Sequence, residues 1–449
     1  MTGGSVRAAL MCGAAVAAAC LLGNAAYADD LTVKAPLSSS PGTDFWTSPY
    51  LFGDAGRTWL KEQGIDLSLG LVDEAVHNLS GGTVTNSAQA GQLNFGAKFD
   101  LNKLVGLQGG LIGLTMVDRF GQNLNTVSDI PALMLTNEVF GRGDILRMTE
   151  FYYSQTLANN QLELKGGRLP VGSDFFFQLC EFVNLTFCGG QPGNVQGGYI
   201  FNFPVSQWGG VAHLHLTNQL TISVGAYDAN PNYLTTSDAS IYALPGIPSS
   251  NPASGVLVPV ELTFKPNWGA YNGAWRLGGW YDDASSIDGG MPGIVTTIPS
   301  VGGVPAQSLG DQRGRYGFYE SIYQRVTAEG SGPQGWYAFL NTTIADHRTA
   351  FEDYQVAGGV KHWGTFDSRP DDEVGFAVGT THVNSAALSP NAGGNEVPFE
   401  AWYGLQATGW MNLKFDLQYV VDPGGRGFNA DGVKTDNAWV IGMRTTVHF

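Results

Sequence analysis

The side chains most able to do chemistry are ionisable ones on the polar side of segments that alternate between apolar and polar residues. Three of them stand out, Arg119, Glu150 and Arg168, with Glu74 in support. Arginine donates hydrogen bonds from a rigid fork and a carboxylate accepts them, so this set suits the binding of a polar solute by hydrogen bonds. Further candidates of the same kind are Lys98, Glu261 and Arg276. For each of these residues the alternative is a charge that is merely solvated, or paired within a wall.

Covalent catalysis and metal binding find little support in the sequence. A nucleophile needs a base within hydrogen-bond reach, and no Ser or Asp can be placed beside any of the 7 histidines. His213 and His215 have the spacing of a two-histidine metal site on one strand face, but no carboxylate is visible to complete it. Asp282, Asp283 and Asp288 lack the ligand spacing of an EF-hand. We therefore predict no enzyme activity, no cofactor and no metal site.

An alternation with a period of two dominates the chain after residue 65. In Gln92–Leu101 one face carries only Leu, Phe and Ala, while the other carries mainly Gln, Asn, Lys and Asp. The same pattern recurs in residues 66–78, 373–382, 400–408, 412–421 and 438–449. Because successive side chains of a strand point to opposite faces, each segment has an apolar face and a wet face. This pattern is typical of a transmembrane barrel with an apolar outside and a water-filled inside; the alternative, a soluble β-sandwich, would bury both sides of its strands.

The connections between these segments alternate between short turns and long loops. The predicted short turns are residues 102–108, 158–160, 217–219, 266–272, 330–334, 365–372 and 408–410. The predicted long loops, rich in Gly, Pro, Ser and Asp, are residues 121–143, 170–204, 229–255 and 283–312. We predict an all-β fold, a transmembrane antiparallel β-barrel of about sixteen strands with both termini on the periplasmic side. The strand pattern is least clear in Gly314–Val326 and Trp336–Thr343.

The chain begins with the features of a secretory signal peptide, predicted to span residues 1–28. Arg7 precedes an apolar run, Ala8–Leu22, and the small residues Ala26 and Ala28 offer a cleavage site. Cys20 allows a lipoprotein signal as an alternative, although apolar residues continue beyond it.

Two further parts follow the predicted cleavage site. Residues 29–65 form a lead-in that contains a short periplasmic helix within Leu51–Gly64, with Asp54 as its cap and Gly64 as its end. Residues 66–449 form the barrel.

The composition excludes some partners and favours others. Removing Arg7 with the signal leaves 23 − 1 = 22 basic against 39 acidic residues, a net charge of −17, which argues against a nucleic-acid binder. No mature stretch reaches the roughly 18 consecutive apolar residues of a membrane-spanning helix. Gly makes up 62 of 449 residues, about twice its usual share. A secreted chain rich in Gly and aromatics is either a soluble all-β protein or a transmembrane barrel.

Two cysteines, Cys180 and Cys188, remain after cleavage of the signal. An even pair in an oxidising compartment predicts a disulfide that closes a short loop. We expect the loop that contains them, Pro170–Pro204, to fold into the barrel with the disulfide stiffening its tip.

Several stretches together resemble the carbohydrate-selective porins of Gram-negative outer membranes, the OprB family. They are LFGDAGRTWLKEQGIDL (51–67), AGQLNFG (90–96), RMTEFYYSQ (147–155), GRLPVG (167–172), FVNLTFCG (182–189), FPVSQWGG (203–210), ANPNYL (229–234) and the end, from FEAWYGLQ to VIGMRTTVHF. The matches are collinear over the mature chain. One departure is Asp54-Ala55-Gly56, where the family usually has Trp and more Gly.

The resemblance implies a sixteen-stranded outer-membrane barrel that passes monosaccharides and small polyols passively. It implies a constriction made by charged side chains and an inward-folded loop, where Arg119, Glu150, Arg168 and Glu74 are the expected sugar ligands. The expected partners are small carbohydrates, outer-membrane lipid and lipopolysaccharide, the barrel assembly machinery and further copies of the chain. Alternatives are a general porin without sugar preference and an outer-membrane barrel enzyme. Substitution of Arg119 is expected to cost little stability, as for a charge in a water-filled tube.

Overall fold

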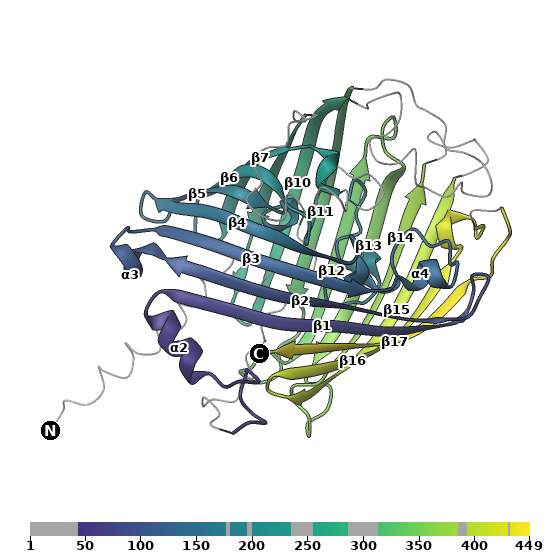
Figure 1. The fold of residues 1–449 in the computed structure, drawn as a ribbon, viewed down its shortest axis with the longest axis horizontal. Coiled ribbons are helices and arrows are strands. Elements are labelled where there is room, and N and C mark those ends of the chain that lie inside the picture. The colour runs from purple at the N-terminus through teal and green to yellow at the C-terminus, as the bar shows by residue number, and fades with distance from the viewer. Residues whose placement is uncertain are drawn as a thin grey trace.

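The alternating segments form strands that pair edge to edge into a closed sheet (Figure 1). In this computed structural model, the described residues are 44–176, 180–194, 200–234, 255–285, 313–384, 393–429 and 432–449. The sheet has 17 strands, of which β9 (Asn267–Trp268) is a two-residue ribbon paired only with β10, so that 16 strands form the wall. The predicted signal peptide and the lead-in as far as residue 43 lie outside the described residues, as do most of the loops at 229–255 and 283–312.

The wall strands follow one another around the barrel in chain order. Their bounds are β1 Ile65–Ser80, β2 Ser87–Asp100, β3 Gly110–Gly121, β4 Ile145–Leu157, β5 Leu162–Leu169, β6 Gln207–His215, β7 Leu220–Asp228, β8 Val256–Phe264, β10 Tyr271–Ser285, β11 Arg313–Arg325, β12 Gly335–Ala345, β13 Glu352–Trp363, β14 Glu373–Val383, β15 Gly394–Thr408, β16 Met411–Val421 and β17 Ala438–His448. Neighbouring strands are antiparallel, and β1 closes the ring by pairing with both β2 and β17. The predicted fold class is confirmed, and the two unclear segments, 314–326 and 336–343, each hold one strand, β11 and β12.

The two faces of the wall differ as the alternation predicts. On β2 the outward Leu93 and Phe95 are 40% and 43% exposed, whereas the inward Gln92 and Asn94 are each 3% exposed. The polar face is therefore the one that is covered. A single sheet cannot cover its own inner face. Other segments of the chain must therefore fold into the barrel and cover part of that face.

The connections sort onto the two ends of the barrel. All seven predicted short turns join consecutive strands at one end, and both β1 and β17 present their terminal residues there, with α2 and α3 nearby (Figure 1). At the other end lie the long loops, two of which, 122–144 and 170–206, are described over most of their length. An even number of strands places both ends of the wall on the same side, as predicted.

The short helix α2 covers Ala55–Glu62, inside the predicted stretch. Asp54 occupies the N-cap position but makes no side-chain cap bond, because its backbone is helical (φ −104°, ψ −22°) rather than extended. The prediction that Asp54 caps the helix is therefore wrong, while Gly64 follows the helix end with φ +96°, as a glycine readily does.

Two very short helices were not predicted. In the turn between β2 and β3, α3 (Leu101–Val105) is capped by the Asp100 side chain, which accepts from the backbone N–H groups of Asn102 and Lys103. The other, α4 (Leu124–Val127), opens the loop after β3. Both are too short to show helical periodicity in the sequence. Among the described residues, no helix has the length and apolar character needed to cross a membrane.

The last residue of the sequence links the wall to the N-terminal lead-in. The Phe449 N–H donates to Leu69 O (3.0 Å), and its carbonyl accepts from Arg57 Nη1 of α2 (3.1 Å). The Phe449 ring stacks on Phe52, with 5.7 Å between ring centroids.

Deletion of Phe449 is expected to lower the yield of folded barrel, because it removes an aromatic residue of the outward face and leaves the inward residues of β17 in place. The measurement is the fraction of heat-modifiable protein in isolated membranes. Phe52→Ala is the matched control, since it removes the ring contact but keeps Phe449. Equal loss in both variants would mean that docking of the lead-in, rather than the terminal residue itself, limits folding.

Candidate functional site

Two loops from the long-loop end fold into the barrel and contact each other. The Glu138 N–H of the loop after β3 donates to Val183 O (3.0 Å), and the Leu185 N–H of the loop after β5 donates to Leu135 O (2.9 Å). We call these residues, 122–144 and 170–206, the first and second inward loops. The remaining passage is therefore bounded by loop on one side and by the polar wall on the other.

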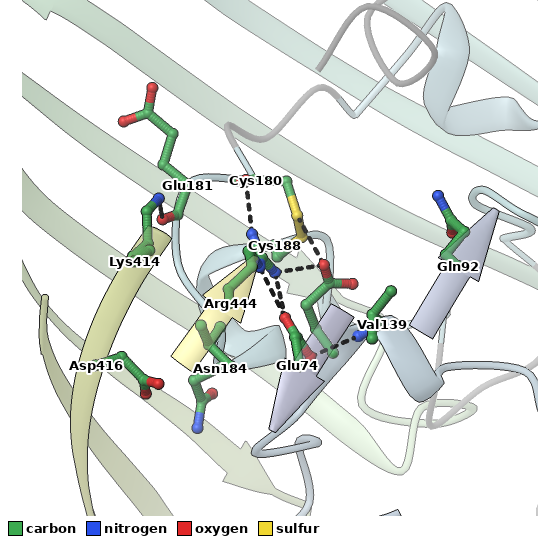
Figure 2. A network of polar contacts seen from close by, with 12 residues as sticks. Glu74, Gln92, Val139, Cys180, Glu181, Asn184, Cys188, Lys414, Asp416 and Arg444 are labelled. Carbon is green, nitrogen blue, oxygen red and sulfur yellow. Dashed lines mark hydrogen bonds and ion pairs between the residues drawn. A yellow bond between two sulfur atoms is a disulfide. The ribbon is translucent and has the colours of Figure 1, made fainter. Parts of the chain in front are cut away.

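Glu74 joins the wall to the first inward loop. Its register partner Arg444 places Nε and Nη2 at 2.8 and 2.6 Å from Glu74 Oε1, and the Val139 N–H donates to Oε2 (3.1 Å) (Figure 2). Arg444 Nη2 also pairs with Glu138 Oε1 at 2.6 Å. Glu74 is 0% exposed, so it holds the loop in place and has no surface left for a solute.

Arg119 faces the interior, as predicted, and spans from wall to loop. Its Nε donates to Gln92 Oε1 on the neighbouring strand (2.7 Å), and its Nη1 donates to Gly141 O of the first inward loop (2.6 Å). The side chain is 6% exposed. Removing it would leave two acceptors without their donor, so the expectation that Arg119 is dispensable for stability is not supported by this geometry.

Two arginines that the sequence analysis did not nominate lie beside Arg119. Arg147 Nη2 donates to Arg142 O (2.7 Å), and Arg142 Nη2 donates to Asn194 O and Oδ1 (2.8 and 3.0 Å). Burial, and then the charges of Arg147 and Arg119, lower the pKa of Arg142 to about 10. None of the three guanidinium groups forms an ion pair with a described carboxylate. The RMTE stretch already contained Arg147, but only the fold shows that it meets a loop arginine.

Glu150 links three elements inside the barrel. It accepts from Thr115 Oγ1 of β3 (2.9 Å) and from Ser173 Oγ of the second inward loop (3.0 Å), and it is 3% exposed. Like those of Glu74, the carboxylate oxygens of Glu150 already accept hydrogen bonds from protein groups.

Arg168 is not brought together with the other three predicted residues. The register pairs it with Phe151 and Trp208, which belong to the outward face, so Arg168 points away from the interior. There its Nη2 donates to Ser206 O (3.0 Å), and its guanidinium lies 4.8 Å from the Tyr233 ring centroid. It stands where the second inward loop begins, as predicted, but on the other side of the wall.

Two further carboxylates hold the loops and were missed as site residues. Glu400 accepts from the Val183 and Asn184 N–H groups (2.8 Å each), and Glu396 accepts from Leu133 N–H (2.6 Å). Both fall on the wet face of β15, which is the only signal that the sequence offered.

His213 has the partners that the sequence analysis did not find. Its Nδ1 lies 2.7 Å from Ser223 Oγ, and its Nε2 lies 3.3 Å from Asp174 Oδ1, a residue of the second inward loop. The statement that no Ser or Asp lies beside a histidine is therefore wrong. Burial opposes ionisation of Asp174, yet the Lys165 ammonium, at 3.1 Å, together with His213 holds the pKa of Asp174 below its usual value.

Among the remaining nominated charges, Glu261 and Arg276 form an ion pair within the wall. Glu261 lies 3.5 Å from Arg276 Nε and accepts from Tyr319 Oη (2.6 Å), while Lys98 is partly exposed. Asp282 forms an ion pair with Arg315, and Asp283 accepts from Val256 N–H, so these neighbours point to opposite faces. Asp288 lies outside the described residues.

The predicted disulfide between Cys180 and Cys188 is confirmed. The disulfide lies beside the charged side chains of Glu74, Glu138 and Arg444, and Cys180 O is 3.4 Å from Arg444 Nη1 (Figure 2). Glu138 lies within 4.8 Å of both sulfur atoms, but sulfurs joined in a disulfide supply no thiolate to a metal ion.

Comparison with known proteins decides the family. The model of the carbohydrate-selective porin, OprB family, matches residues 85–449. The chain belongs to this family. It is 32% identical over 436 residues to Porin B of Pseudomonas aeruginosa, covering 90% of this chain and 92% of that protein. It is 28% identical over 443 residues to a putative porin, QuiX, of Acinetobacter baylyi, covering 90% and 95%.

A solved structure agrees with the sequence comparisons. The high-pH structure of Pseudomonas putida OprB superposes with a TM-score of 0.79 at 30% identity, covering 90% of this chain and all of that one. This OprB-family barrel is therefore a carbohydrate-selective porin of a Gram-negative outer membrane, with an apolar face toward lipid and a passage limited by its two inward loops.

Glu400→Ala is expected to loosen the second inward loop. It leaves the buried N–H groups of Val183 and Asn184 without an acceptor, at a cost of about 1–3 kcal/mol each, and we expect a lower unfolding temperature and larger, noisier single-channel conductance. The control is Glu163→Gln, a lumenal carboxylate that accepts from Ser154 Oγ (2.8 Å) and holds no loop amide. Wild-type conductance and stability in Glu400→Ala would contradict the anchoring role.

The disulfide gives a second expected outcome. Mass spectrometry of a non-reduced digest should find the peptides of Cys180 and Cys188 linked. Modification of both cysteines by a thiol reagent without prior reduction would show that the bond does not form in the protein.

Proposed function

We propose that the porin passes glucose-like monosaccharides and small polyols passively, and that Arg119, Arg142 and Arg147 supply the hydrogen-bond donors of its constriction. The observation that carries this proposal is the unused donor capacity of the cluster. Toward described residues, Arg119 donates hydrogen bonds only from Nε and Nη1. Arg142 and Arg147 each donate only from Nη2. The remaining guanidinium N–H groups suit the hydroxyl groups of a neutral sugar.

The other predicted ligands receive different roles in this proposal. Glu74 and Glu150 shape the passage by fixing the inward loops, because their oxygens are already engaged. Arg168 fixes the base of the second inward loop from the outward face. We further propose that the barrel contacts lipopolysaccharide through its outward face, is inserted by the barrel assembly machinery and associates with copies of itself.

Membership of a porin family supports a channel rather than an enzyme, and one observation favours the second candidate, a hydrolase. Ser223, His213 and Asp174 form a hydrogen-bonded line of the kind used in covalent catalysis. We propose that it is structural. Ser223 is 3% exposed, and the carboxylate is also bound by Lys165, which leaves it less able to stabilise a cationic His213.

A fluorophosphonate probe tests the hydrolase alternative. We expect no labelling of the folded barrel, because the Ser223 hydroxyl is out of reach. Labelling that disappears in Ser223→Ala, while Ser154→Ala keeps it, would favour an enzyme.

Arg119→Ala tests the channel proposal. Loss of about 1–1.5 kcal/mol of hydrogen bonding should weaken block of the current by glucose roughly tenfold in a planar bilayer, and should raise cation selectivity in a salt gradient. Since Gln92 and Gly141 also lose their donor, we expect a lower unfolding temperature as well.

Two variants separate sugar binding from other effects. Arg119→Lys keeps the positive charge but lacks the planar guanidinium group with its several donors. Compared with Arg119→Ala, it should therefore restore ion selectivity more than sugar block. Arg369→Ala, in the turn between β13 and β14, holds neither inward loop and should leave sugar block unchanged. If glucose at graded concentrations does not reduce the wild-type current at all, the protein is a general porin without a binding constriction.

A further inference from the structure

The N-terminal lead-in follows the short-turn rim of the barrel from one strand to the next. The Gly409 N–H, in the turn between β15 and β16, donates to Trp46 O (2.8 Å). The Leu51 N–H donates to His448 O at the end of β17 (2.8 Å). We call residues 44–62, which include α2, the rim segment.

The same segment continues past β1 to the turn between β2 and β3. Arg57 of α2 donates to Leu67 O of β1, and Lys103 Nζ in that turn donates to Lys61 O (2.9 Å). Figure 1 shows α2 beside the start of β1 at this end of the barrel. Because β16, β17, β1 and β2 are consecutive in the wall, the rim segment runs along the circumference of the barrel and not across its opening.

Four large aromatic side chains of the rim segment are exposed. Phe52 is 77% exposed, Trp46 62%, Trp59 60% and Phe45 49%. Aromatic surface of this extent is unfavourable in water, and its concentration on one part of a protein marks a contact with an apolar partner. The rim segment therefore presents an uncovered apolar edge.

The wall itself carries exposed aromatic residues at this end over only part of its circumference. On β9, β10 and β12 they are Trp268, Tyr271, Trp275 and Trp336. From β16 through β17 and β1 to β3, the short-turn halves of these described strands contain neither Trp nor Tyr. The rim segment lies along this same sector. Since girdles of Trp and Tyr mark the membrane–water boundary of a barrel, Trp46 and Trp59 occupy the part of the girdle that the wall lacks.

Helix α2 has an apolar side and a polar side. Trp59 is exposed on the first, whereas the exposed polar residues Thr58 and Glu62 share the second. At about 100° per residue, Thr58 lies roughly a quarter-turn around the helix from Trp59. A helix divided in this way suits the interface of a membrane, where its axis lies parallel to the surface. The Trp59 side is then the one that meets lipid, and the Thr58 side meets water.

The apolar outward face of the wall continues onto the rim segment. Phe449, an outward residue that follows β17, stacks on Phe52 with 5.7 Å between ring centroids. Lipid covers the outward face of the wall, so the exposed rings of the rim segment adjoin lipid directly. We propose that the rim segment binds the phospholipid of the periplasmic leaflet, with Trp46, Phe52 and Trp59 inserted at the level of the headgroups. It thereby fixes the height in the membrane of β1 and β17, the strands that close the sheet.

Site-directed spin labelling tests this contact in the whole protein, reconstituted into vesicles of phosphatidylethanolamine and phosphatidylglycerol. A nitroxide attached at Trp59→Cys is compared with one at the adjacent Thr58→Cys. We expect the ratio of collisions with oxygen to collisions with a water-soluble nickel chelate to be at least about threefold higher at position 59, because oxygen concentrates in lipid. The native cysteines do not react with the label, since they form the Cys180–Cys188 bond.

Quenching by brominated phospholipid provides a second measurement, on a variant that keeps an aromatic ring. The tryptophan emission lost in Trp59→Phe is expected to belong to the part that lipid brominated near its headgroup quenches, so the variant is quenched less than the wild type. Trp402→Phe is the control, because Trp402 is buried inside the barrel and its emission should escape the quencher.

The folded state of each variant is checked by its heat-modifiable migration. Equal collision ratios at positions 58 and 59, with Trp59 emission unquenched, would overturn the proposal and leave the rim segment in water. Protection of position 59 from both oxygen and the nickel chelate would also overturn it, because protein rather than lipid would then cover the helix.

Discussion

Carboxylates on the inner wall that accept backbone N–H groups of the inward loops are the interaction on which the rest of this porin depends. Glu74, Glu396 and Glu400 each bind at least one loop amide, and all three are buried. A loop inside a barrel has no sheet of its own to satisfy its backbone, so the wall must provide acceptors. A carboxyl group has two oxygens, so one side chain can accept two such N–H groups, as Glu400 does from Val183 and Asn184.

These anchors explain why charged residues are abundant inside the barrel: several of them bind the inward loops. Lys361 and Lys414 bind Glu181 of the second inward loop through its side chain and its carbonyl, respectively. The net effect is a rigid frame in which the arginine cluster around Arg119 keeps part of its donor capacity. In the proposed function, selectivity for neutral, hydroxyl-rich solutes depends on the guanidinium N–H groups that this frame leaves unused.

The sequence predicted the wall well because its signal is local. Alternation in each segment assigns the faces of Glu74, Arg119 and Glu150, and all three point inward. Arg168 was misplaced, because its role was taken from its position before a loop and not from the parity of β5. The anchoring partners could not be predicted: Glu400 lies 217 residues from Val183, and no pattern in one sequence reports such a contact. The same holds for Asp174 beside His213, which belongs to a loop without periodicity.

The Glu74–Arg444 ion pair joins the first wall strand to the last, across 370 positions of the chain. It also positions the loop residue Val139, so ring closure and loop anchoring share one contact. The passage between the inward loops and the wall is therefore incomplete until β17 has paired with β1. A chain that is only partly inserted into the membrane has neither a closed sheet nor an anchored first inward loop. Quality control that recognises unclosed barrels would thus also remove those whose permeability is not yet restricted.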